Sequence, residues 1–275
     1  MRINTNVMAL NAQNMLGRNQ SSVQSSIAKL SSGLRINGAA DDAAGLAISE
    51  KMRSQIRGLD QAESNAQDGI SLIQTAEGAL QQTTDILQRM RELVIKSENS
   101  GVLEDRDVDA IEVELEALKE EINRIAQSTT FNGKVLLDGD YKSTELSFKI
   151  GANTFDCDSL GVTIGDMQAA ALGVASLNVT DATNAATSLK CIDAAINTVS
   201  SERAKLGAVQ NRIEYAIENL STTGENLSAA ESRIRDVDMA SEMVSYTKNN
   251  ILQQAAMAML AQANQQPEQI MTLLQ

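Results

Sequence analysis

Apolar residues recur every seven positions along the first long stretch of this chain, as the following positions show: Met52, Leu59, Ala66, Ile73, Leu80, Leu87 and Val94. A parallel row runs beside it: Leu72, Ala79, Ile86 and Leu93. No proline interrupts the pattern. The spacing therefore predicts a single helix over residues 44–98, roughly 80 Å long at about 1.5 Å per residue.

Two further stretches repeat helical spacing. One alternates steps of three and four, which is the pattern of a coiled-coil interface: Val108, Ile111, Leu115, Leu118, Ile122 and Ile125. The other again has apolar residues seven apart: Ile192, Val199, Leu206, Ile213, Leu220, Leu227 and Ile234. Because this last stretch matches the first in length, we expect the two to lie antiparallel, with these eleven residues in the core of a rod: Ile73, Leu80, Leu87, Val94, Ile192, Val199, Leu206, Ile213, Leu220, Leu227 and Ile234.

The centre, residues 139–181, has a different character. Leu146, Phe148 and Ile150 alternate with other residues, "GAN" is a turn signal, and "GVTIG" offers a second short apolar run. Alternation with period two is typical of strands, so the centre predicts a small β-hairpin region.

Both ends of the chain are weakly apolar and nearly neutral. Residues 1–36 show heptad-like spacing, and the stretch "NNILQQAAMAMLAQANQQ", residues 249–266, carries no charged side chain. Its eight Asn and Gln side chains argue against a membrane span, because unpaired amides in hydrocarbon are costly. As a helix it needs neighbours on more than one side, which favours association of many copies.

We therefore predict a mainly α fold: a long antiparallel helical coiled-coil rod with a small β-hairpin region and both termini paired as helices at one end. The terminal helices are expected to pack between subunits through ten residues: Val7, Leu10, Leu16, Ile27, Leu30, Ile251, Leu252, Ala255, Met259 and Leu260.

Composition narrows the function. The net charge of −13 argues against a nucleic-acid partner, and the absence of histidine removes His-based triads and HExxH zinc sites. Cys157 and Cys191 form no paired motif, and Asp41 and Asp42 lack the spacing of a calcium loop. We therefore expect that the protein is not an enzyme and that it binds neither a cofactor nor a metal ion. The start has no apolar run like a secretory signal, so we expect any export to use another route.

At this point the sequence resembles the bacterial flagellins. The resemblance covers well over half of the chain and rests on these stretches: "MRINTNVMALNAQN", "LSSGLRINGAADDAAGLAISEKMRSQIRGL", "NAQDGISLIQTAEGAL", "ILQRMREL", "FNGKVLLDG", "LGAVQNRIEYAIENLSTTGENLSAAESRIRDVDMASEM" and "ILQQAAMAMLAQANQQP".

The resemblance implies a structural subunit that polymerises with itself into the extracellular helical filament of the flagellum, used for swimming motility. It also implies a division of the chain. Residues 1–40 and 239–275 would form an inner filament core, 41–138 and 182–238 the rod, and 139–181 a short central region without large outer domains.

The same resemblance implies several partners. The family is exported unfolded through the flagellar type III apparatus and assembles under a cap protein, with hook-associated proteins nearby. A dedicated export chaperone holds the C-terminal segment, here about residues 236–275. A host flagellin-sensing Toll-like receptor would contact Gln88, Arg89, Leu93 and Glu114, although these residues equally fit filament contacts between subunits.

Three other readings compete with a filament subunit. A hook–filament junction protein shares related ends but is less consistent with the unbroken match at both termini. An enzyme would need a catalytic constellation in the short centre, which offers no histidine and no paired carboxylates with a nucleophile. A cytoplasmic coiled-coil scaffold would tolerate charge at its ends, whereas this chain concentrates neutrality there.

Overall fold

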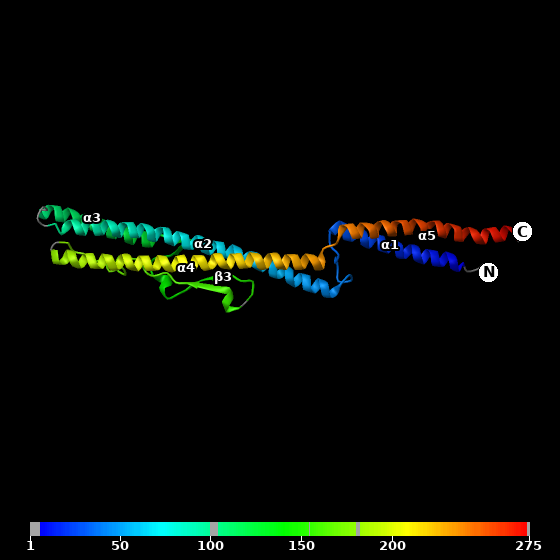
Figure 1. Ribbon diagram of the computed structural model, residues 1–275, viewed down its shortest axis with the longest axis horizontal. Coiled ribbons are helices and arrows are strands. Elements are labelled where there is room, and N and C mark those ends of the chain that lie inside the picture. Colours follow the sequence, from blue (N-terminus) through cyan, green and yellow to red (C-terminus); the bar gives the residue numbers. More distant parts are fainter. Residues whose placement is uncertain (1–5, 100–103, 154, 180–181, 274–275) are drawn as a thin grey trace. The chain divides into compact units, whose positions relative to one another are not determined.

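The structure, a computed structural model, describes residues 6–99, 104–153, 155–179 and 182–273. The described residues form the following helices: α1 (Val7–Ser32), α2 (Ala43–Ser97), α3 (Asp105–Ser128), α4 (Ala182–Arg235) and α5 (Met239–Leu273) (Figure 1). Short strands and 3-10 turns lie between α3 and α4: β1 (Thr130–Phe131), β2 (Lys134–Val135), η1 (Asp140–Lys142), β3 (Leu146–Lys149), η2 (Asp156–Asp158) and β4 (Ser159–Val162). The prediction of a mainly α fold with a small β region is confirmed, and α2 lies within one residue of the predicted 44–98.

The chain divides into two compact units. Unit 1 comprises residues 1–56 and 225–275, and unit 2 comprises residues 57–224. The long helices α2 and α4 each contribute residues to both units. The sequence analysis instead divided the chain into five segments by their expected place in a filament, and that division stays a prediction.

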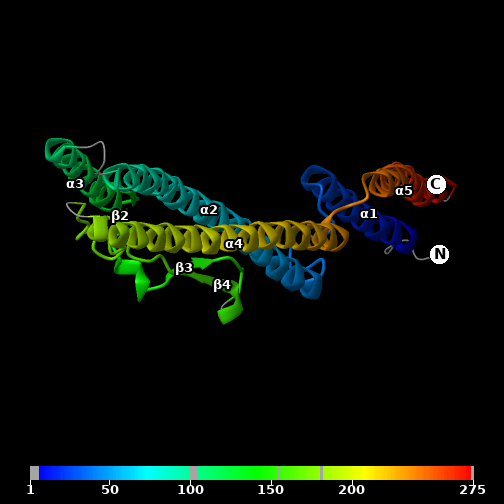
Figure 2. The ribbon, with the colours of Figure 1, turned by 60° about the vertical axis from the view of Figure 1, so that its left-hand side comes forward.

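Unit 2 is built around an antiparallel pair, α2 with α4, to which α3 adds a third helix (Figures 1 and 2). Two salt bridges connect α2 with α4 in this unit. Arg91 Nε lies 2.9 Å from Asp193 Oδ1, and Arg203 Nη2 lies 3.6 Å from Glu77 Oε1. Such exposed pairs contribute little to stability, and the apolar core between the helices contributes most of it.

The predicted heptad residues occupy this core as far as Ile213. Ile73, Leu80, Leu87, Val94, Ile192, Val199, Leu206 and Ile213 are no more than 1% exposed. Leu220 is 9% exposed, and Leu227 and Ile234 are only half-buried and belong to unit 1. The last two are less buried than the rest of the predicted set, because α3 has 24 residues against 54 in α4 and covers only part of the longer helix. Their place in the rod core stays a prediction.

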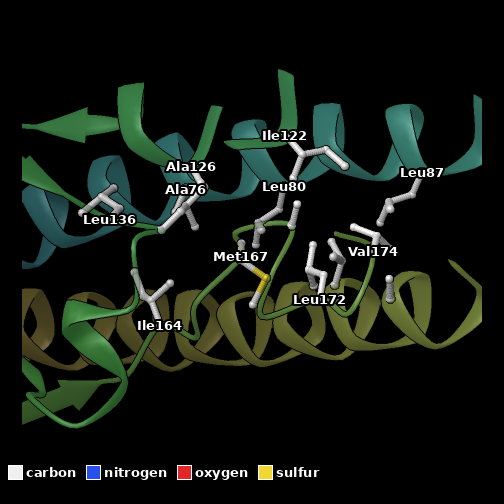
Figure 3. Packing of buried hydrophobic residues seen from close by; sticks show 14 of the residues in the cluster. Ala76, Leu80, Leu87, Ile122, Ala126, Leu136, Ile164, Met167, Leu172 and Val174 are labelled. Carbon is white, nitrogen blue, oxygen red and sulfur yellow. The ribbon is translucent and has the colours of Figure 1, made fainter. Parts of the chain in front are cut away.

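A loop fills much of the space between the helices of unit 2. Figure 3 shows Met167, Leu172 and Val174 of this loop pointing into the same core as Leu80 and Ile122 of the helices. The buried loop residues are Ile164, Met167, Ala169, Leu172, Val174, Leu177 and Val179. The sequence analysis assigned the whole centre to a small β-hairpin region and did not predict this burial, because the apolar residues of the loop follow neither helical nor strand spacing.

A buried loop must satisfy its backbone polar groups without a sheet or helix. Polar side chains of the surrounding helices do part of this. Glu202 Oε1 accepts the Gly165 N–H at 3.0 Å, Asn123 Oδ1 accepts the Ala169 N–H at 3.0 Å, and Lys119 Nζ donates to the Leu177 carbonyl at 3.4 Å. Ser188 Oγ accepts the Asn178 N–H at 3.1 Å and donates to the Asn178 carbonyl at 2.8 Å. Glu202 and Lys119 are themselves buried. Their charges are offset by ion pairs to Lys205 at 2.9 Å and Glu116 at 3.2 Å.

Two antiparallel strand pairs complete unit 2. β3 pairs with β4, with Leu146 opposite Val162, which confirms the predicted hairpin. The pair β1–β2 was not predicted, although Asn132 and Gly133 form a tight turn with φ angles of 48° and 78°. An Asn-Gly pair between short strands is a known sequence signal for such a turn, so this hairpin was available from the sequence.

We expect Glu202→Ala to lower the free energy of unfolding by about 1–3 kcal/mol, because the buried Gly165 N–H would lose its acceptor. Urea denaturation of the full chain measures this. Glu218→Ala, which removes an exposed carboxylate from the same helix, should change stability by less than about 0.5 kcal/mol. Equal effects of the two variants would contradict this account of the loop.

Candidate functional site

Unit 1 carries no net charge. Residues 1–56 and 225–275 contain nine basic and nine acidic side chains, so the net charge of −13 lies on residues 57–224. Like charges on copies of a protein oppose close packing. Unit 1 is therefore the part of the chain that can approach another copy with the least electrostatic repulsion.

Within unit 1, α1 and α5 lie side by side and antiparallel (Figure 1). At one end Asn6 Nδ2 donates to the Ala263 carbonyl at 2.8 Å, while Asn6 Oδ1 caps α1 by accepting the Ala9 N–H at 3.1 Å. At the other end Leu34 and Asp236 form an antiparallel bridge. Both ends of the pair are thus held by backbone and amide hydrogen bonds.

The contact between the two helices, here called the seam, consists of heptad-spaced positions that are half-buried or buried. On α1 these are Ala9, Ala12, Leu16, Asn19, Val23, Ser26 and Leu30. On α5 they are Tyr246, Asn249, Gln253, Ala256, Leu260 and Ala263. Small and amide side chains dominate both sets. The seam therefore allows the helices to approach closely but buries little apolar surface.

Most of the large apolar residues of these helices lie on the other sides, here called the outer faces. On α1 they are Val7, Met8, Leu10, Met15 and Ile27; on α5 they are Met239, Met243, Val244, Ile251, Leu252, Met257 and Met259. All are between 42% and 70% exposed. An amphipathic helix pair in water normally shows the opposite arrangement.

The outer face of α5 is also hollowed. A groove of about 510 Å³ runs along it, lined by Met243, Val244, Thr247, Lys248, Ile251 and Leu252. Contiguous exposed apolar surface with a shaped groove is typical of a surface that another molecule covers.

The ten predicted packing residues separate into two groups. Val7, Leu10, Ile27, Ile251, Leu252, Ala255 and Met259 are exposed. Leu16, Leu30 and Leu260 are half-buried in the seam. Ala263, one helical turn beyond Met259, is buried, because the helix turns that position toward α1.

The sequence analysis missed the role of the amides Asn249 and Gln253, which it had no reason to place against α1. Apolar periodicity identifies which residues share a helix face. It does not say which face the partner helix takes. No amphipathic signal in α5 alone distinguishes the seam from the outer face.

The predicted receptor residues lie on α2 and α3 in unit 2. Gln88 and Arg89 are exposed, and Arg89 Nη2 donates to Glu114 Oε1 at 2.8 Å while its Nη1 reaches Glu92 Oε2 at 3.2 Å. These hydrogen bonds, first to Glu114 and then to Glu92, raise the pKa of the Arg89 guanidinium above its usual value. The guanidinium is held in a fixed, charged position on the surface.

Leu93 does not join this surface. It is 3% exposed and packs in the core of unit 2, so its prediction as a contact residue is wrong for this conformation. The heptad pattern had already placed Leu93 in a row beside the core residues. Leu93 turns into the core between the helices, whereas Arg89, one helical turn earlier, reaches over the surface to Glu114 of α3, and Gln88 is exposed.

Other chemistry is sparse among the described residues. None of their His, Cys, Asp and Glu side chains form a group of three or more that could hold a metal ion. Cys157 and Cys191 are free thiols. Asp41 Oδ2 accepts the N–H groups of Asn37 and Gly38 at 3.0 and 3.2 Å, which stabilises the turn before α2. None of the described helices is long and apolar enough to cross a membrane.

Comparison with known proteins agrees with this picture. Residues 3–142 match the family of the bacterial flagellin N-terminal helical region, and residues 189–274 match that of the C-terminal helical region. The chain is 56% identical to a flagellin of Bacillus subtilis and 53% identical to one of Halalkalibacterium halodurans, each over the whole of both chains. A crystal structure of Bacillus cereus flagellin is 28% identical, with a TM-score of 0.50, and covers 61% of this chain and 94% of its own.

Replacing two glycines by alanine, one inside α1 and one at its C-terminal cap, should change the stability of α1 in opposite directions. Gly33 ends the helix with φ of 72°, so Gly33→Ala should destabilise the α1 terminus by about 1 kcal/mol. Gly17 lies inside the helix with open space around it, so Gly17→Ala should stabilise α1 by about 0.5–1 kcal/mol. Hydrogen exchange of α1 peptides, followed by mass spectrometry, measures both. The same sign for both variants would contradict the assigned helix end.

Proposed function

The chain belongs to the bacterial flagellin family, and we propose that its copies polymerise through the outer faces of α1 and α5. Members of this family are structural subunits of the flagellum. This chain is accordingly the subunit that polymerises into the extracellular helical filament of the bacterial flagellum, which serves swimming motility. The observation that carries the proposal is the inverted arrangement of unit 1, with small and amide residues in the seam and large apolar residues outside.

Assembly would stabilise the outer faces in a simple way. Burying an exposed Val, Leu, Ile or Met side chain contributes about 1.5–3 kcal/mol when burial is complete. Twelve such residues lie on the outer faces, so even partial burial supplies a large driving force. The zero net charge of unit 1 supports the same role, because bringing many copies together there adds no net repulsion.

The contact is proposed to be heterologous, so that one surface of a subunit meets a different surface of the next. A head-to-tail contact that does not close into a ring produces a helical filament. The chain offers two dissimilar surfaces for this. The outer face of α1 carries five exposed apolar residues and the exposed Arg18, whereas that of α5 carries seven exposed apolar residues and the groove lined in part by Lys248.

From this we propose roles for the predicted segments. Residues 1–40 and 239–275 form the inner core of the filament, 41–138 and 182–238 form the rod, and 139–181 forms a short central region. The well-buried core of unit 2 supports a rod that holds its shape before and after assembly. No enzymatic role is proposed, because no catalytic constellation supports one.

The partners that handle the chain before assembly follow from the same surface. We infer that an export chaperone covers residues 236–275, because exposed Met, Leu and Val side chains on α5 are an aggregation hazard in a crowded cell. Cap and hook-associated proteins are proposed to meet the ends of the growing polymer, where the outer faces of the last subunits stay uncovered.

A host flagellin-sensing Toll-like receptor is proposed to bind the free subunit at Gln88, Arg89 and Glu114. The ordered Arg89–Glu114 ion pair supports this, since a pre-organised charged pair costs less entropy to bind than two mobile side chains. Leu93 is left out of the proposed surface because it is buried.

We expect Leu252→Asp and Met259→Asp each to slow elongation of filament seeds by at least about a hundredfold, because a charge would enter an apolar contact between subunits. Both side chains are exposed in the single chain, so its helicity should not change. Light scattering with electron microscopy measures elongation, and far-UV circular dichroism measures helicity. A chain lacking residues 241–275 should elongate no seed.

The matched controls are Ser143→Asp, which adds the same charge to an exposed position in the centre, and Ser143→Ala. Both should elongate seeds at the rate of the unmodified chain. Normal filaments from either α5 variant would refute the proposed role of the outer face. Failure of the unmodified chain to elongate any seed would refute the polymer role under these conditions.

For the receptor, we expect Arg89→Ala to weaken activation by the free subunit about tenfold, the usual effect of losing one charge-assisted contact. Arg124→Ala is the control, because Arg124 is also an exposed arginine that forms a salt bridge with a glutamate, Glu121 of the same helix. A receptor-reporter cell assay with size-purified monomer measures activation. Equal loss in both variants would show that the effect is not local to Arg89.

A further inference from the structure

The methionines of this chain are unevenly exposed. Nine of the eleven have side chains that the structure describes, and six of these lie on the outer faces of unit 1 with 48% to 60% of their surface exposed: Met8, Met15, Met239, Met243, Met257 and Met259. By contrast, Met90 and Met167 are buried in unit 2, and Met52 is half-buried. No seam position defined above is a methionine.

We propose that these six methionines are a redox-modification site that controls addition of the subunit to the filament. A peroxide converts their thioethers to sulfoxides, and the oxidised chain keeps its own fold but does not join the polymer. This inference rests on the proposed packing of copies through the outer faces.

The chemistry balances with hydrogen peroxide as the oxidant. The thioether sulfur attacks one peroxide oxygen, the O–O bond breaks, and an S–O bond forms. The sulfur loses two electrons, and the other peroxide oxygen leaves as water after proton transfer. A thiol-dependent reductase reverses the step, because two thiols supply the electrons, become a disulfide and release the oxygen as water.

The location of the sulfurs decides which contacts are lost. A sulfoxide places a strong hydrogen-bond acceptor where an apolar surface must be buried, and exposed apolar neighbours such as Val244, Ile251 and Leu252 cannot donate to it. The seam contains no methionine, so pairing of α1 with α5 is unaffected. The buried Met90 and Met167 are shielded by the core around them, so unit 2 also keeps its packing.

The same geometry makes the modification selective for the free subunit. If copies pack through the outer faces, the six sulfurs become covered in the filament and lose access to peroxide. Oxidation then limits the supply of competent subunits and leaves finished filament intact.

The test uses the full chain carrying Cys157→Ser and Cys191→Ser, so that thiol oxidation does not contribute. Monomer is treated briefly with hydrogen peroxide, the peroxide is removed, and elongation of untreated seeds is followed. Peptide mass spectrometry gives the sulfoxide fraction at each methionine. We expect high conversion at the six outer positions, little at Met90 and Met167, unchanged helicity, and elongation slowed at least about tenfold, the cost of one buried unpaired acceptor.

Two variants then assign the effect. Replacing all six outer methionines by leucine keeps apolar surface of similar volume but removes the reactive sulfur, so this variant should elongate normally before and after peroxide. The control Met90→Leu with Met167→Leu should lose elongation after peroxide just as the parent chain does. Peroxide sensitivity that persists in the six-leucine variant would overturn the proposal.

A second measurement needs no variant. Partly oxidised parent chain is offered to seeds, and the filament and the remaining monomer are separated and mapped. Sulfoxides at the six positions should be depleted in the filament fraction; equal content in both fractions would overturn the proposal. If untreated chain fails to elongate, the proposed polymer contact itself fails, and this result is distinct from peroxide insensitivity.

Discussion

The weak pairing of α1 with α5 is the constraint on which the behaviour of this subunit depends. Alanines, serine and amides occupy much of the seam, while most of the large apolar residues of the two helices point outward. A pair of helices built this way gains little from its own contact in water. In the polymer contact that we propose, it gains stability when other copies cover its outer faces. Folding of the terminal helices and growth of the polymer are then driven by the same burial of apolar surface.

Unit 2, by contrast, buries its large apolar residues within the single chain. Its heptad residues, the helix α3 and the loop over residues 163–179 fill one continuous core, and helix side chains hydrogen-bond to the backbone of that loop. Such a core does not need a neighbour to be stable. The net charge of −13 also lies here, which opposes non-specific association through this unit. Charge and apolar exposure thus direct association to unit 1.

One surface accounts for several properties of the subunit. The exposed side chains of α5 would serve the polymer contact and the chaperone binding that we propose, and they include sulfurs open to the oxidation that we infer. Methionine is well suited to such a surface, because its flexible thioether packs against irregular neighbours. The same polarisable sulfur is the atom that a peroxide attacks. Adaptability in the contact and vulnerability to oxidants therefore have one chemical origin.

The sequence alone determined the elements that depend on spacing along the chain. Uninterrupted heptads without proline predicted α2 and α4 closely, because a helix places every seventh residue on one side whatever surrounds it. The Leu146–Ile150 alternation likewise predicted the β3–β4 hairpin. The uncharged stretch at residues 249–266 indicated association, since no solvated helix needs such a surface. Each of these conclusions rests on local periodicity or composition.

Only the tertiary structure decided which faces those elements turn toward one another. It placed Asn249 and Gln253 in the seam and Ile251 and Met259 outside, buried Leu93, and filled the core of unit 2 with a loop that has no periodicity. Leu227 and Ile234 are only half-buried because α3 covers only part of α4. Their heptad spacing cannot indicate how far α3 extends. The physical reason is common to all these cases: periodicity states which residues share a side of an element, whereas burial depends on what packs against that side.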